Sequence, residues 1–246
     1  MLPQPLSPDP SVYLISHSQP GPDYLLFLEE QASNYSPDAS FADALCELSG
    51  RVCYDSFANR RPGGNSAYLQ RIKEAGHGEV IEHSVFTFFL DSISRSCLGQ
   101  LTRYRAGFSF CVRSSRFCNE ASSPFLFPST SLSTTLLDQL LDHERQTRLL
   151  YSKIQDELAT SPTKIKNQAA RYILPQGTAT SLVMTCNARS LRHALEQRCS
   201  LHADYEIRLL FNRIYNKVKH LNLFADYTPH PQEDGTFTLS TDYRKV

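Results

Sequence analysis

The first 50 residues of this 246-residue chain contain no lysine and no arginine. A secretory signal begins with a basic segment, and a transit peptide is rich in arginine, so neither kind of targeting segment is expected. Long apolar runs are also missing: the longest, SVFTFFL, has about the length of one strand. No membrane span is therefore expected.

Closely spaced cysteine pairs are absent as well. The chain has seven cysteines, an odd number, and no C-x-x-C pair. A zinc ribbon or a disulfide framework requires closer pairs. Scattered reduced thiols are typical of a protein in a reducing compartment, so we expect a cytoplasmic location.

A net excess of charge is lacking too, because 25 basic residues balance 25 acidic ones. This balance argues against binding to bulk nucleic acid or to a membrane surface, which usually requires a basic excess. The hydrophobic fraction of 41% is that of an ordinary globular protein, long enough for one large domain or two small ones.

Several sequence motifs are missing. The chain has neither G-x-x-x-x-G-K-[ST] nor G-x-G-x-x-G. His77, Glu82 and His83 fit neither H-E-x-x-H nor H-x-x-E-H, so no metal site is predicted. Ser114 and Ser115 have no histidine or carboxylate near them in sequence, which does not support a nucleophilic serine.

The remaining pattern predicts an α+β fold, with a central antiparallel or mixed sheet flanked by helices. Half of the 14 prolines lie in the first 37 residues. Residues 1–40 are therefore interpreted as a mostly irregular N-terminal arm, and residues 41–246 are interpreted as one domain. Strands are expected within 83–92, 108–117, 171–187 and 235–240. Helices are expected within 40–56, 66–78 and 93–107, over a long segment at 135–158, and in a C-terminal pair at 188–198 and 202–221. In the first helix, Ser40 is a plausible N-cap, with Ala42, Leu45, Leu48 and Val52 along one face.

Two windows have arginines but no acidic residue. Residues 92–119 contain five arginines, and residues 158–195 contain three arginines and two lysines. A buried arginine without a partner costs several kcal/mol. Either carboxylates elsewhere in the chain or water take up these charges, or arginine side chains bind an anionic ligand with more than one phosphate.

The second window has a helical spacing of its own. Arg189, His193 and Gln197 fall at i, i+4 and i+8, on one face of a helix whose expected N-cap is Asn187. The N-terminus of a helix with this composition favours a phosphate or an electron-rich ring.

Four stretches together resemble the flavin-dependent thymidylate synthases. They are RVCYDS near position 51, GHGEVIEHSVFTF from Gly76, QLTRYRAGFSFCVRSSRF from Gln100, and ARYILPQGTATSLVMTCNARSLRHALEQRCSLHADYEI from Ala170. The third resembles the family signature, Arg-His-Arg, seven residues and Ser-x-Arg. The resemblance implies the fold of that family and a catalytic domain over 41–246.

The resemblance also implies the chemistry. Such enzymes are homotetramers whose sites lie between subunits. They bind FAD, take a methylene group from methylenetetrahydrofolate and methylate dUMP, with NADPH reducing the flavin. No nucleic acid or membrane partner is implied.

Site residues are carried over by position. Arg198 is expected to be catalytic, because it matches the arginine that contacts the uracil ring and stabilises charge on it. Cofactor contacts are expected from His77, Glu79, Arg103, Tyr104, Arg105, Asn187, Ala188, Arg189 and His193. Substrate contacts are expected from Gln100, Arg103, Val112, Ser114, Ser115, Arg116, Arg171 and Arg198.

Two departures from the signature leave other functions open. Tyr104 stands where the triplet usually has histidine, and eight residues rather than seven separate Arg105 from Ser114. A β-bulge at Gly107 would absorb the extra residue. The extra residue also places Val112, two residues before Ser114, where an acidic or amide side chain is usual. The alternatives are a flavin- and folate-dependent methylase of another uridine nucleotide, or a module that binds RNA or single-stranded DNA.

Overall fold

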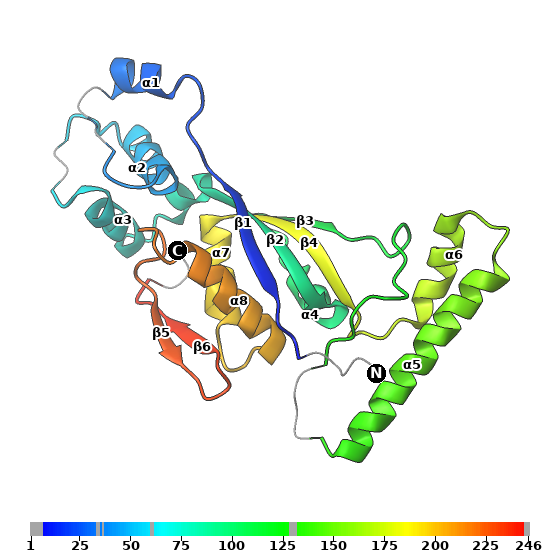
Figure 1. The fold of residues 1–246 in the computed structure, drawn as a ribbon. Helices are drawn as coiled ribbons and strands as arrows, with labels where there is room; N and C mark the ends of the chain where they lie inside the picture. The colour runs from blue at the N-terminus through cyan, green and yellow to red at the C-terminus, as the bar shows by residue number, and fades with distance from the viewer. Residues whose placement is uncertain (1–6, 33–34, 36, 60–61, 128–131, 244–246) are drawn as a thin grey trace. The chain divides into compact units, whose positions relative to one another are not determined.

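A computed structural model describes residues 7–32, 35, 37–59, 62–127 and 132–243. It has a four-stranded sheet of order β1-β2-β4-β3, formed by β1 (Ser11–His17), β2 (Val85–Ser94), β3 (Phe108–Val112) and β4 (Ala179–Asn187). A second, two-stranded sheet pairs β5 (Thr228–Pro231) with β6 (Phe237–Ser240) (Figure 1). The predicted combination of a sheet with flanking helices is confirmed.

Hydrogen bonds show that the central strands run antiparallel. The backbone N–H of Ala188 donates to Ser84, and the Thr87 and Thr185 hydroxyls lie 3.0 Å apart between β2 and β4. In β2, Phe86, Phe88 and Leu90 alternate with less buried residues and are fully buried. One face of β2 therefore belongs to the core.

The chain divides into two compact units. As far as they are described, unit 1 contains the residues up to Ser11, Leu90–Arg103 and Phe110–Val183, and unit 2 contains Val12–Phe89, Tyr104–Ser109 and Met184–Val246. Strands β2 and β4 each begin in one unit and end in the other. The predicted boundary at residue 40 stays a prediction.

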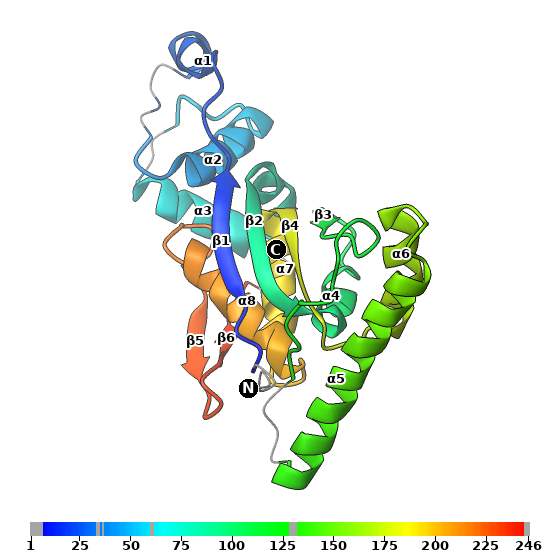
Figure 2. The same ribbon diagram turned by 45° about the vertical axis from the view of Figure 1, so that its right-hand side comes forward.

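Unit 1 contains α4 (Arg95–Leu101), α5 (Thr134–Glu157), α6 (Thr163–Ala170) and the short η2 (Arg171–Ile173). Helices α5 and α6 lie side by side (Figures 1 and 2). Glu120 of this unit is fully buried, and its carboxylate lies 3.4 Å from the Arg95 guanidinium and 3.5 Å from that of Arg113. The guanidinium of Arg148 donates to the Glu120 carbonyl.

Unit 2 contains α1 (Tyr24–Gln31), α2 (Phe41–Cys53), α3 (Gly64–Glu74), η1 (Gly78–His83), α7 (Ala188–Arg198) and α8 (Tyr205–Val218). Helix α7 packs on both η1 and α8. Its Arg192 side chain is fully buried and donates two hydrogen bonds to Asp226, of 2.8 and 2.9 Å. This pair joins α7 to the C-terminal region of unit 2.

Most predicted elements are confirmed, and Ser40 caps α2 by accepting a hydrogen bond from Asp43. The structure differs from the expectations in several details. The arm contains β1 and α1, and α6 was not predicted. The helix expected over 93–107 is limited to α4, since β2 extends to Ser94. Val52 is 60% exposed, because the buried face of α2 is formed by other residues, including Ala42 and Leu48. In the described part of the chain, no helix has the length and apolarity needed to cross a membrane.

Candidate functional site

The N-terminus of α7 binds the loop that carries several of the expected site residues. The side chain of Asn187 accepts a hydrogen bond of 2.8 Å from the Ser190 backbone N–H, so the predicted N-cap is confirmed. Its own N–H donates to the Gly107 carbonyl, 3.1 Å away, and the Ser190 hydroxyl donates to the Ala106 carbonyl at 2.9 Å. These bonds attach the loop that carries Tyr104 and Arg105 to the start of α7, while Ala188 is fully buried beneath it.

Gly107 makes this attachment possible. Its φ is +70°, and a Cβ atom there would overlap Ser190 Oγ and lie 2.8 Å from Asn187 Nδ2. The glycine lies in the turn before β3 and not within the strand, so a bulge in the strand is not what accommodates this position. A side chain at residue 107 would move the loop away from α7.

The exposed face of α7 carries the three residues predicted from their spacing. His193 and Gln197 are exposed, and the side chain of Arg189 is 42% exposed. Arg189 donates to Glu82 at 2.7 Å. It lies against Gly78, where a Cβ atom would come within 2.6 Å of Arg189 Nε. The missing side chain at Gly78 therefore allows Arg189 to pack along η1.

His77 directly precedes η1 and is half-buried. Its Nδ1 lies 2.7 Å from the Tyr54 hydroxyl, and the two rings are stacked with centroids 5.7 Å apart. Glu79 is exposed. Sequence reasoning did not select Tyr54, although it lies within one of the four quoted stretches.

Tyr104 and Arg198 are in direct contact. Arg198 Nε donates to the Tyr104 hydroxyl at 2.8 Å, and its guanidinium carbon lies 5.2 Å from the centre of the tyrosine ring. The same hydroxyl donates to Gln197 Oε1 at 3.0 Å. Burial raises the pKa of Tyr104, and Arg198 only partly offsets this rise, so the phenol stays neutral at physiological pH.

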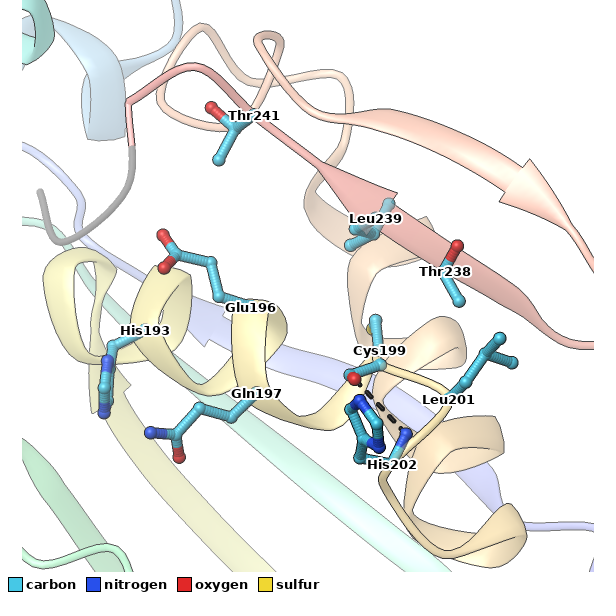
Figure 3. A pocket seen from close by; sticks show the side chains of 10 residues that line it. His193, Glu196, Gln197, Cys199, Leu201, His202, Thr238, Leu239 and Thr241 are labelled. Atoms are coloured by element: carbon cyan, nitrogen blue, oxygen red, sulfur yellow. Dashed lines mark hydrogen bonds between the residues drawn. The ribbon is translucent and has the colours of Figure 1, made fainter.

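A cavity of about 590 Å³ borders the C-terminal half of α7. His193, Glu196 and Gln197 line it from α7, and the strand β6 closes the opposite side with Thr238 and Leu239 (Figure 3). Gln197 therefore both accepts the Tyr104 hydrogen bond and faces the cavity.

The expected substrate residues other than Arg198 lie in unit 1. Arg116 Nε donates to Gln168 of α6 at 3.1 Å, a partner that the sequence did not indicate. Ser115 is buried and the Ser114 hydroxyl accepts from the Arg116 N–H at 3.4 Å. Further members are Gln100, Val112 and Arg171, all half-buried, and the exposed Arg103.

The arginines of the two acid-free windows, together with the neighbouring Arg198, fall into two groups. Four have carboxylate partners in the protein: Arg95 and Arg113 with Glu120, Arg189 with Glu82, and Arg192 with Asp226. The expectation of ligand partners is therefore wrong for Arg95, Arg113 and Arg192, because Glu120 directly follows the first window and Asp226 is brought in by folding. Among the described residues, no carboxylate partner is found for Arg103, Arg105, Arg116, Arg171 or Arg198.

No group of three or more His, Cys, Asp or Glu side chains able to hold a metal ion occurs among the residues the structure describes. The site residues described above offer guanidinium, imidazole, phenol and amide groups. Such groups bind phosphates and the polar edges of heterocyclic rings.

The chain is similar to known proteins along most of its length. A family model described as "Thymidylate synthase complementing protein" matches residues 37–221. Flavin-dependent thymidylate synthases of Corynebacterium efficiens and Mycobacteroides abscessus are 34% and 35% identical to the chain, over 85% of it and 89% of each relative.

Solved structures share the fold. Thymidylate synthase X of Helicobacter pylori, with FAD and dUMP, has a TM-score of 0.62 at 21% identity, over 88% of this chain and 98% of that one. A UMP/dUMP methylase of Streptomyces cacaoi bound with 5-bromo-UMP has a TM-score of 0.62 at 20% identity, over 90% and 95%. By its match to the family model and its identity to these relatives, this chain belongs to the flavin-dependent thymidylate synthase family.

Proposed function

We propose that this protein is an FAD-dependent thymidylate synthase, which methylates dUMP with methylenetetrahydrofolate as carbon donor and NADPH as reductant. The observation that carries the proposal is the set of five arginines without carboxylate partners in the described residues, at positions that match the family's phosphate and pyrimidine contacts. Guanidinium groups left without counter-ions in the folded chain suit two anionic ligands.

The residues at the start of α7 fit a flavin dinucleotide. Arg105 is exposed on the loop joined to α7, and a pyrophosphate would be favoured at the capped N-terminus of this helix. Arg103, also exposed, directly precedes this loop in the sequence. Asn187, Arg189, His193, His77 and Glu79 complete the expected cofactor contacts. When bound, FAD supplies the hydride that completes the methyl group.

Arg198 is the proposed catalytic residue. Its Nε is engaged by Tyr104, while its two terminal nitrogens have no hydrogen-bond partner among the described residues. These nitrogens can donate to a carbonyl oxygen of the uracil ring, and their charge stabilises negative charge that develops on the pyrimidine. Such stabilisation makes carbon 5 a better nucleophile. Arg116, Arg171 and Ser114 are assigned to the phosphate and sugar of the nucleotide.

The visible spectrum tests this proposal. Protein purified with added FAD should be yellow, and NADPH should bleach it under anaerobic conditions. With methylenetetrahydrofolate and 5-tritiated dUMP, the reduced enzyme should release tritium to water. A colourless protein that takes up no added FAD would overturn the proposal, and so would bleaching without any release of tritium from a uridine nucleotide.

A second substrate, UMP, has support from two observations. Val112 ends β3 at a position where the family usually has an acidic or amide side chain. An apolar group there changes the hydrogen bonds offered to the nucleotide, and a neighbour in fold is a UMP/dUMP methylase. Parallel tritium-release assays with dUMP and UMP decide between the two, and a preference for UMP would replace dUMP as the substrate. An RNA-binding role has no comparable support, because the family consists of enzymes.

We further propose a cytoplasmic homotetramer whose sites combine residues from different subunits. Arg116 is held by Gln168 within unit 1, and Arg198 is held by Tyr104 within unit 2, so each unit orients part of the expected set by itself. Light scattering should give four chains per particle. Co-expression of Arg116→Ala with Arg198→Ala should restore activity in about a quarter of the sites, because intact halves then meet. Absence of any recovery would show that both residues act from one subunit.

A further inference from the structure

In the hydrogen bonds that join Tyr104 to α7, the donor and the acceptor of each bond can be assigned. An arginine Nε–H can only donate, so the Tyr104 oxygen accepts from Arg198 and its own proton must go elsewhere. That proton goes to Gln197 Oε1. The order is therefore Arg198 Nε–H, Tyr104 O–H, Gln197 Oε1, with each group in one role.

This order determines what the flanking groups offer to a ligand. With Nε engaged, Arg198 keeps its planar pair of terminal nitrogens available. With Oε1 engaged as an acceptor, Gln197, which lines the cavity, keeps its amide nitrogen as a donor. One phenol thus sets the orientation of two neighbouring side chains of α7.

The phenol is itself held in place. The ring of Tyr104 packs against Phe108 and Phe211, with centroids 5.2 and 6.3 Å away, and meets His193 edge-on at 6.5 Å. Gly107 and Ser190 fix the loop that carries it. A tyrosine with so many neighbours has few rotamers available, so its hydroxyl is a rigid acceptor.

We propose that Tyr104 is a positioning residue of this enzyme: it orients the Arg198 guanidinium toward the pyrimidine through the Arg198–Tyr104–Gln197 hydrogen bonds. The role rests on the proposed function. It assigns to this chain's tyrosine a task distinct from the flavin contact that the position implies, since Tyr104 acts on the substrate through Arg198. The imidazole usual at this position is shorter than a phenol, which reaches Arg198 Nε here.

Tyr104→Phe is the test, because it removes the hydroxyl and keeps the ring. We expect kcat with dUMP to fall about 10- to 100-fold, the loss typical for a hydrogen bond to a charged group, while KM changes less than threefold. FAD content, thermal midpoint and the rate of flavin bleaching by NADPH should equal those of the wild type. Tyr13→Phe is the matched control, since Tyr13 is 56% exposed and its hydroxyl has no partner among the described residues.

A double-mutant cycle separates positioning from a structural role. Once Arg198→Lys has removed the Nε donor, adding Tyr104→Phe should lower kcat by less than threefold. If Tyr104→Phe lowers kcat by the same factor with Arg and with Lys at position 198, the proposal is overturned. Loss of FAD from the Tyr104→Phe variant, or an unchanged kcat in it, would also overturn the proposal. A wild-type protein that binds no FAD would instead overturn the proposed function.

Discussion

Arg192 and Asp226 are joined by two hydrogen bonds of 2.8 and 2.9 Å, in a place where the arginine side chain is fully buried. Lys73 approaches the same carboxylate at 2.5 Å, and the ring of Tyr227 lies 4.7 Å from the Arg192 guanidinium. Two buried cations, Arg192 and Lys73, thus share the Asp226 carboxylate, and we expect the stability of unit 2 to depend on it.

Removing the charge of Asp226 should destabilise the protein strongly. Asp226→Asn removes the charge of the one carboxylate to which both buried cations, Arg192 and Lys73, donate hydrogen bonds. We expect a loss of about 3–5 kcal/mol in the free energy of unfolding. Urea denaturation measures it. Asp142→Asn is the control, because Asp142 is 61% exposed and its pair with Arg145 on α5 is worth about 1 kcal/mol or less. Equal midpoints for the two variants would contradict the prediction.

The same carboxylate predicts a loss of stability in acid. Burial by itself raises the pKa of Asp226, but the hydrogen bonds and charges of Arg192 and Lys73 outweigh it and lower the pKa to about 2. Because the folded pKa lies below the unfolded value of 3.8, this stabilisation is complete above pH 4 and is lost as the pH falls toward 2. Urea midpoints measured between pH 5 and pH 2 should fall more for the wild type than for Asp226→Asn. Parallel curves would show that Asp226 does not titrate in this range.

Gly107→Ala should displace the Tyr104 loop. A methyl group there meets Ser190 Oγ and Asn187 Nδ2, and φ is +70°, so we expect a loss of about 1–3 kcal/mol together with a fall in kcat. Gly235→Ala separates the two causes. Its φ is +79° with nothing within 4 Å of the added carbon, so it should cost stability but leave kcat unchanged. If both variants keep full activity, the contact between the loop and α7 does not matter for catalysis.

Arg198→Ala should lower the rate of turnover strongly and leave the flavin in place. The loss of a charge directed at the pyrimidine costs about 10²–10³ in rate. The flavin spectrum and FAD content should match the wild type, because the cofactor contacts are assigned to residues other than Arg198. Single-turnover assays with reduced enzyme measure the rate, and normal turnover by this variant would remove Arg198 from the mechanism.

Arg103→Ala should weaken FAD retention. Arg103 is exposed and has no carboxylate partner among the described residues, so its removal leaves the protein stable. The dissociation constant for FAD, from the quenching of flavin fluorescence, should rise about tenfold or more, as for the loss of a charge-assisted hydrogen bond. Arg145→Ala on α5 is the control and should change neither quantity. Unchanged affinity in Arg103→Ala would assign the flavin to other arginines.

Much of the fold could be predicted from local pattern. The long helix α5, the strand β2 and the cap of Asn187 on α7 follow from periodicity and capping chemistry, which act within a few residues. Strand β1 was missed because it lies between prolines and pairs with a strand about 70 residues away. Pairing at such a distance leaves no local signal.

In the candidate site too, local contacts could be predicted from the sequence and distant ones could not. The exposed row of Arg189, His193 and Gln197 could be predicted, because helical geometry places residues four apart on one face. The partner of Arg192 could not, since Asp226 is 34 residues away in sequence. Local composition counts charges but does not say which ones meet.

By itself, the sequence determined the family, most of the helices and strands and the arginine-rich windows, because residue type and short-range spacing carry that information. Only the tertiary structure decided which arginines are neutralised by Glu120, Glu82 and Asp226, and that the hydroxyl of Tyr104 lies between Arg198 and Gln197. The reason is physical: a hydrogen bond or an ion pair depends on distances of about 3 Å, which folding sets between residues far apart in the chain.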